Sequence, residues 1–90
     1  GPAALGALGD CYAQLDQLDK ATAAFLKAAD KADNNTLSPI YLKKAGAIFE
    51  KQGKYDDAVK AYTKVKDKYF NSYQAMDIDK YIDRANAAKK

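Results

Sequence analysis

Residues 39–69 read PIYLKKAGAIFEKQGKYDDAVKAYTKVKDKY, two apolar-periodic runs on either side of the glycine at position 53. In each run the apolar residues recur every three or four positions, which is the spacing of one face of an α-helix. They are Leu42, Ala45 and Phe49 in the first run and Ala58, Ala61, Tyr62 and Val65 in the second. Gly53 can adopt the positive φ that ends a helix at low cost. The stretch therefore predicts a hairpin of two helices.

Gly46 stands in the middle of the first predicted helix, where a glycine costs about 1 kcal/mol relative to alanine. A helix keeps such a residue when a neighbouring element must approach its backbone closely. The returning helix is the nearest candidate. We therefore expect Gly46 to lie against Tyr62 or Ala58.

The same pattern occurs 37 residues earlier, where Gly9 takes the place of Gly46 and Phe25 that of Tyr62. A third apolar run follows position 72 and matches only the first half of the repeat, as expected for the terminal cap of a stacked array. Its expected buried residues are Tyr73, Ala75, Ile78, Ile82 and Ala85. The expected N-cap residues of the later helices are Asp19, Ser38 and either Asn71 or Ser72.

The two hairpins resemble the tetratricopeptide repeat, a helix–turn–helix unit of about 34 residues. The resemblance rests on Leu8, Gly9, Tyr12, Ala21, Phe25 and Ala28, and on Gly46, Phe49, Gly53, Tyr55, Ala58 and Tyr62. Asp16 departs from the family pattern, because it replaces the turn glycine. The resemblance implies an all-α right-handed superhelix in a single domain over residues 1–90, with repeats at about 2–33 and 39–69 and a capping helix at about 72–88.

Family resemblance also implies a non-enzymatic scaffold for protein–protein interaction, in which the first helix of each repeat lines a groove for a peptide or a partner helix. The residues expected to line the groove are Asp10, Gln14, Lys43, Ala47, Lys51, Tyr73 and Lys80. Tyr41 and Tyr73 are expected to lie outside the core stripe and to be free to contact a partner. The alternative is a structural or oligomerisation segment of a larger protein, with no ligand in the groove.

Other classes of function find little support in the sequence. The chain has no histidine or tryptophan, one cysteine, and no glycine-rich loop that could cradle a phosphate before a helix, so no catalytic, metal-binding or cofactor-binding residue is predicted. Cys11 is expected to be a packed thiol. The net charge is +3, but the lysines alternate with acidic residues, which argues against nucleic-acid binding. No apolar run approaches the ~20 residues that cross a bilayer.

Two expectations concern the context of the chain. Residues 68–75 also resemble bacterial repeat proteins of the cell envelope, which would imply an anchor preceding residue 1; a cytoplasmic location is the alternative. Gly1, Pro2 and Ala3 look like the interior of a longer protein. No helix covers the outer face of the first helix, so we expect Leu5 and Leu8 to be partly bare and to favour self-association or extension by further repeats.

Overall fold

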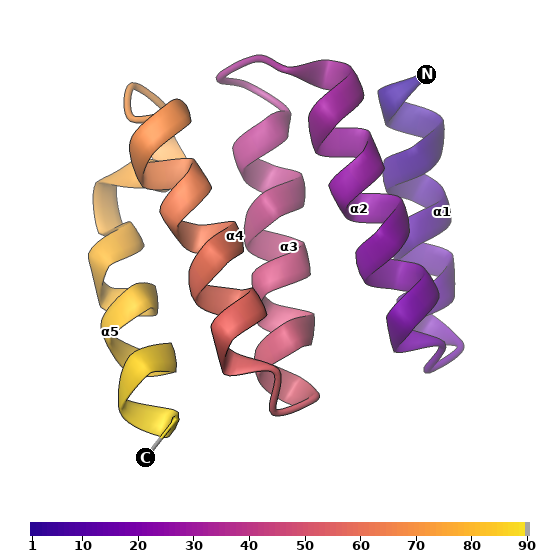
Figure 1. The fold of residues 1–90 in the computed structure, drawn as a ribbon. Helices are drawn as coiled ribbons and strands as arrows, with labels where there is room; N and C mark the ends of the chain where they lie inside the picture. The colour runs from indigo at the N-terminus through magenta and orange to yellow at the C-terminus, as the bar shows by residue number, and fades with distance from the viewer. Residues whose placement is uncertain (90) are drawn as a thin grey trace.

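The computed structural model describes residues 1–89, which form five α-helices and one 3-10 helix: α1 (Pro2–Gln14), α2 (Leu18–Ala32), α3 (Ser38–Lys51), α4 (Tyr55–Lys68), η1 (Tyr73–Asp77) and α5 (Ile78–Ala88). Each helix packs on the next along the chain, so that α1 and α5 lie at opposite ends of the stack (Figure 1). The stack measures 34 × 30 × 14 Å. The expected all-α fold of two hairpins and a C-terminal helix is confirmed.

In both hairpins an aromatic ring of the second helix packs directly against a glycine of the first helix. A Cβ on Gly46 would lie less than 3.0 Å from the ring of Tyr62, and a Cβ on Gly9 less than 3.0 Å from the ring of Phe25. Real Cβ atoms essentially never come so close to another heavy atom. The prediction that Gly46 marks a helix–helix contact is therefore confirmed, with Tyr62 as the partner.

A third contact of this kind joins the two hairpins and corrects a prediction. Tyr41 was expected to be free for a partner, but it is only 9% exposed. Its ring lies over Gly6 of α1, where a Cβ would also be less than 3.0 Å away, and stacks on Phe25 with a centroid distance of 6.4 Å. Tyr41 is thus a packing residue between the repeats.

One continuous core runs through the stack. Its buried members come from α2, α3, α4, α5 and the loop after α4. The largest fully buried side chains include Tyr62, Phe25, Leu42, Ile78 and Val65. Each buried aliphatic or aromatic side chain of this size contributes about 1.5–3 kcal/mol by its removal from water.

The turns use positive φ at three places. Gly53 has a φ of 74°, as predicted, and Asp16, at the equivalent position of the first hairpin, has a φ of 59°. Asp33 ends α2 with a φ of 42°. Aspartate tolerates this left-handed conformation better than most residues, so Asp16 can replace the turn glycine of the family pattern.

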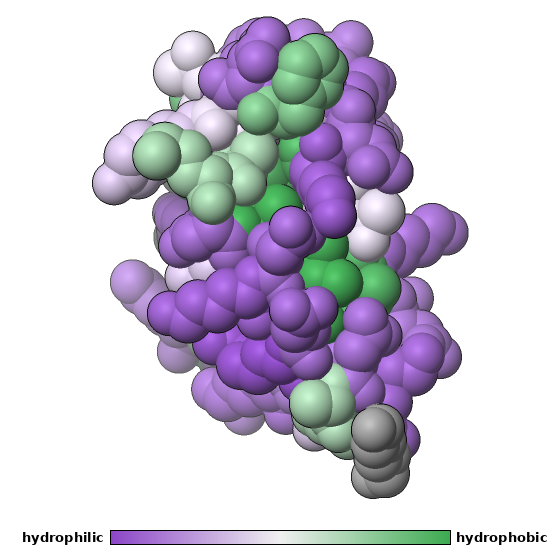
Figure 2. Space-filling model, turned by 90° about the vertical axis from the view of Figure 1, so that its left-hand side faces the viewer, coloured by the Kyte–Doolittle hydropathy of each residue, from purple (hydrophilic) through white to green (hydrophobic). Residues whose placement is uncertain are grey.

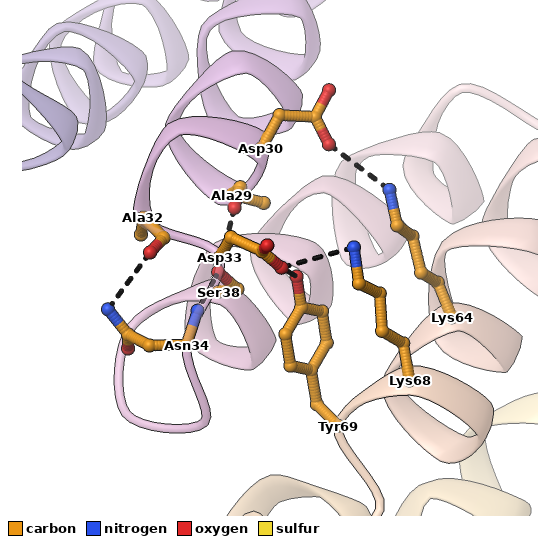
Figure 3. A network of polar contacts seen from close by, with 9 residues as sticks. All are labelled: Ala29, Asp30, Ala32, Asp33, Asn34, Ser38, Lys64, Lys68 and Tyr69. Atoms are coloured by element: carbon orange, nitrogen blue, oxygen red, sulfur yellow. Dashed lines mark hydrogen bonds and ion pairs between the residues drawn. The ribbon is translucent and has the colours of Figure 1, made fainter.

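Two of the three predicted N-caps are wrong. Ser38 is the first residue of α3 and not its cap; its Oγ donates a hydrogen bond to the carbonyl of Ala29 at 2.7 Å (Figure 3). Asp19 lies inside the first turn of α2, where its carboxylate accepts a hydrogen bond from Gln52 on the next hairpin. Both side chains are therefore used between elements instead of at a helix end.

The predicted last helix also differs from the structure. Ser72 is the cap, as one of the two alternatives had it, because its Oγ accepts a hydrogen bond from the N–H of Ala75. The turn that follows is the 3-10 helix η1, and α5 begins only at Ile78. Tyr73 is consequently 81% exposed, so its expected place in the buried stripe is wrong, whereas the other expectation, that it lies outside the core, is confirmed. Cys11 is likewise exposed, so the expectation of a packed thiol is wrong.

Candidate partner-binding groove

The predicted groove lies across α1, α3, η1 and α5, and its first part is a depression between α3 and η1. This depression, of about 320 Å³, is lined by Lys43, Tyr73, Met76 and Asp77. Tyr73 and Met76 are each 81% exposed. Ser72 caps η1, and the tight 3-10 turn places both large side chains beside Lys43.

A second depression continues from Lys43 toward the middle of the stack. It measures about 270 Å³ and is lined by Lys43, Lys44, Ala47, Tyr62 and Tyr81. The Nζ of Lys43 lies 4.4 Å from the centroid of the Tyr81 ring, within the range of a cation–π interaction. We call the residues that line the two depressions the groove surface.

Carboxylates of the chain itself neutralise both lysines of the groove surface. The Nζ of Lys43 lies 2.9 Å from Oδ1 of Asp77, and the Nζ of Lys44 lies 2.9 Å from Oδ1 of Asp10. The hydrogen bond from Lys43 holds the pKa of Asp77 below its ordinary value. An acidic ligand would therefore compete with Asp77 for Lys43.

A polar cluster around Glu50 contacts the groove surface through Tyr62. Tyr62 donates its hydroxyl to Oε1 of Glu50 at 2.6 Å, and Arg84 on α5 donates to both carboxylate oxygens at 2.8 and 3.0 Å. The hydrogen bonds from Arg84 keep the pKa of Glu50 low, and burial raises the pKa of the Tyr62 hydroxyl. Because Arg84 lies on α5 and Glu50 on α3, this cluster fixes α5 against the second repeat.

The predicted groove residues fall into two groups. Lys43, Ala47 and Tyr73 line the depressions, and Asp10 joins them through its ion pair with Lys44. The other three are exposed but line neither depression: Gln14, Lys51 and Lys80.

Five residues of the groove surface were missed by the prediction: Lys44, Tyr62, Met76, Asp77 and Tyr81. Met76 and Asp77 lie in the 3-10 turn, which apolar periodicity assigned to a regular helix. Lys44 is adjacent to the predicted Lys43, and the ring of Tyr81 lies on Tyr62 at a centroid distance of 5.5 Å. Of the missed residues, Tyr81 is the one that the sequence signals, because a buried aromatic residue such as Tyr62 often packs against another ring.

Comparison with known families matches both hairpins. Residues 2–34 match one family description of the tetratricopeptide repeat and residues 42–69 match another, 33 and 28 residues that together make 61 of the 90. The chain is a tetratricopeptide repeat protein. Neither a curated protein nor a solved structure was found to match this tetratricopeptide repeat protein.

Tetratricopeptide repeats are in general modules for protein–protein interaction. In the part of this tetratricopeptide repeat protein that the structure describes, residues 1–89, no helix is both long and apolar enough to span a membrane. Within the same residues, no three His, Cys, Asp or Glu side chains are grouped so that they could hold a metal ion.

Proposed function

We propose that this tetratricopeptide repeat protein is a non-enzymatic scaffold that binds an extended or helical segment of a partner protein on the groove surface. The observation that carries the proposal is the exposure of Tyr73 and Met76 beside Lys43. Tyrosine and methionine are enriched at protein interfaces, and exposed large apolar side chains next to a polar rim mark interaction sites.

The charges of the groove surface define the partner further. A segment with an apolar residue and a nearby carboxylate fits best, because the apolar residue can lie between Tyr73 and Met76 while the carboxylate competes with Asp77 for Lys43. Exposed ion pairs contribute only up to about 1 kcal/mol each, and salt screens them. Binding is therefore weak and salt-sensitive.

A display library of short peptides tests this proposal. Peptides selected on the wild-type chain should lose binding to a Tyr73→Ala, Met76→Ala variant, since both apolar contacts are removed. Phe70→Ala is the matched control, because Phe70 is a large exposed side chain, at 66%, that does not line the groove surface. If the control loses as much binding as the double variant, the groove assignment is wrong.

A different observation favours the alternative function, a structural or oligomerisation segment. Leu8 and Leu15 of the first hairpin are 42% and 66% exposed, at the end of the stack that no helix among residues 1–89 covers. Sedimentation over a range of concentrations separates the two functions. A concentration-dependent dimer that Leu8→Glu dissolves supports oligomerisation; a monomer throughout supports the scaffold.

A further inference from the structure

A separate depression lies on the N-terminal side of the stack, and it shares no residue with the groove surface. It measures about 280 Å³ and lies between α1 and α2. We call its lining residues the N-face: Leu5, Leu8, Tyr12, Lys20, Ala23, Ala24 and Lys27. At the opposite end of the stack, the side that α5 presents is mostly hydrophilic, with apolar surface in a narrow strip and at its upper end (Figure 2).

The same depression occurs in the second repeat, and there a helix covers part of it. Six N-face residues have counterparts 37 positions later that line a depression of about 270 Å³: Leu42, Phe49, Asp57, Lys60, Ala61 and Lys64. The rest of its wall is Leu26 and Asp30 of α2. The molecule itself thus shows which element fits this face, an amphipathic helix that presents a leucine and, four residues later, an aspartate.

Ion pairs fasten this covering helix to the second repeat. Asp30 of α2 pairs with Lys64 of α4 at 3.1 Å, and Asp33, just after α2, pairs with Lys68 at 3.1 Å (Figure 3). The two acids therefore follow Leu26 at four and seven residues. These pairs set the register of α2 along α4.

The equivalent lysines of the first repeat are present but unmatched. Lys27 and Lys31 stand 37 residues before Lys64 and Lys68, and neither forms an ion pair within residues 1–89. No residue of the N-face is acidic, and Lys20 stands where the second repeat has an aspartate. The N-face is thus an apolar depression with a basic rim.

We propose that the N-face binds an acidic amphipathic helix of a partner protein. The helix presents an apolar residue to Leu5 and Leu8, and carboxylates four and seven residues later to Lys27 and Lys31. A second copy of the chain fits less well, because a two-fold pairing through this face would set Lys20 and Lys27 against lysines of the copy. This surface is separate from the groove surface, and each proposal can fail alone.

A synthetic peptide with the sequence of residues 18–33 is a suitable probe, because it carries Leu26, Asp30 and Asp33 in the required spacing. Titrated into the isotope-labelled 90-residue chain, it should shift the amide NMR signals of Leu5 and Leu8. Reversal of both lysines, Lys27→Glu with Lys31→Glu, should weaken binding roughly tenfold, from two exposed ion pairs lost and replaced by repulsion. A peptide in which Asp30 and Asp33 are replaced by lysine should restore binding to that variant.

A matched pair of variants tests the apolar part of the N-face. Leu8→Glu should abolish the shifts, whereas Leu15→Glu should leave them unchanged, because Leu15 is exposed on the same hairpin but lies outside the depression. Thermal melts of both variants show that they fold. Three results would overturn the proposal: equal affinity after lysine reversal, shifts centred on Leu42 and Phe49, or a dimer that Leu8→Glu dissolves.

Discussion

Gly9 lies against the ring of Phe25 in the first hairpin, and 37 residues later Gly46 lies against the ring of Tyr62 in the second. In both hairpins the ring occupies space that the Cβ of any other residue would need. The two repeats therefore share this contact between ring and glycine. Any difference in the contacts that hold the two helices of each hairpin together must involve other side-chain atoms.

That difference is polar. Tyr62 donates its hydroxyl to Glu50, which Arg84 of α5 holds from the far side. Phe25 has no hydroxyl, and Ala13 stands where the second repeat has Glu50. The second hairpin thus has both the tyrosine hydroxyl and the carboxylate that accepts its hydrogen bond, and the first hairpin has neither. This is expected because a buried polar group without a partner is costly. Shape closes the first hairpin; shape and a link to the next helix close the second.

The largest expected effect comes from breaking the shared steric contact. Gly46→Leu should lower the free energy of unfolding by about 1–3 kcal/mol or more, because the side chain overpacks against Tyr62. Urea denaturation measures it. Lys51→Leu, an exposed position on the same helix, is the control and should change stability little. Equal losses from the two changes would contradict the close-approach argument.

A smaller loss of stability should follow from adding a tyrosine hydroxyl to the first hairpin. Phe25→Tyr places a hydroxyl beside Ala13, where it lacks a carboxylate acceptor, and should destabilise by about 1–3 kcal/mol. Adding Ala13→Glu supplies the acceptor of the second repeat and should recover part of the loss. A double variant no more stable than Phe25→Tyr alone would show that the two hairpins differ in more than these atoms.

The smallest expected effect is the pH dependence of the stability that the Glu50–Arg84 ion pair contributes. The folded-state pKa of Glu50 lies below its ordinary value of 4.5, chiefly because of the hydrogen bonds from Arg84. The stabilisation is therefore fully present above pH 4.5 and is lost as pH falls through the lower folded-state pKa. Because Arg84 is half exposed, Arg84→Ala should cost about 1 kcal/mol or less at neutral pH.

Denaturation midpoints of wild type and Arg84→Ala, measured from pH 7 down to pH 3, should converge below pH 4.5. Lys80→Ala, an exposed residue on the same helix, should follow the wild type at every pH. A gap between wild type and Arg84→Ala that stays constant over the whole range would mean that Arg84 acts through packing and not through the charge of Glu50.

The features predicted correctly are those that depend on residues within one hairpin. The contact of Gly46 with Tyr62 and the positive φ of Gly53 follow from local spacing and from the special conformational freedom of glycine. The family and the all-α fold follow from the repetition of that local pattern. Such patterns can be recognised without knowing how one hairpin sits on the next.

The errors concern contacts between hairpins. Tyr41 lies beside the apolar stripe of its own helix, and its burial depends on Gly6 in the preceding hairpin. Ser38 looked like a helix cap, but its hydroxyl reaches the carbonyl of Ala29 on another helix. Five of the eight residues of the groove surface were missed for the same reason, since the relative placement of α3, η1 and α5 decides which side chains meet.

The order of charges along the chain has a consequence for how such a protein can evolve. Asp10–Lys44, Asp30–Lys64 and Glu50–Arg84 each join an acid to a base 34 positions later. The first repeat already contains both the acid and the base of such a pair. A tandem duplication of residues 1–37 would set Asp30 of the first copy 34 positions before Lys27 of the second. Its junction would also bring together Asp33 and Lys31 at the 35-residue separation of Asp33 and Lys68. A gene duplication could thus lengthen this array in one step and keep these two ion pairs at the new boundary.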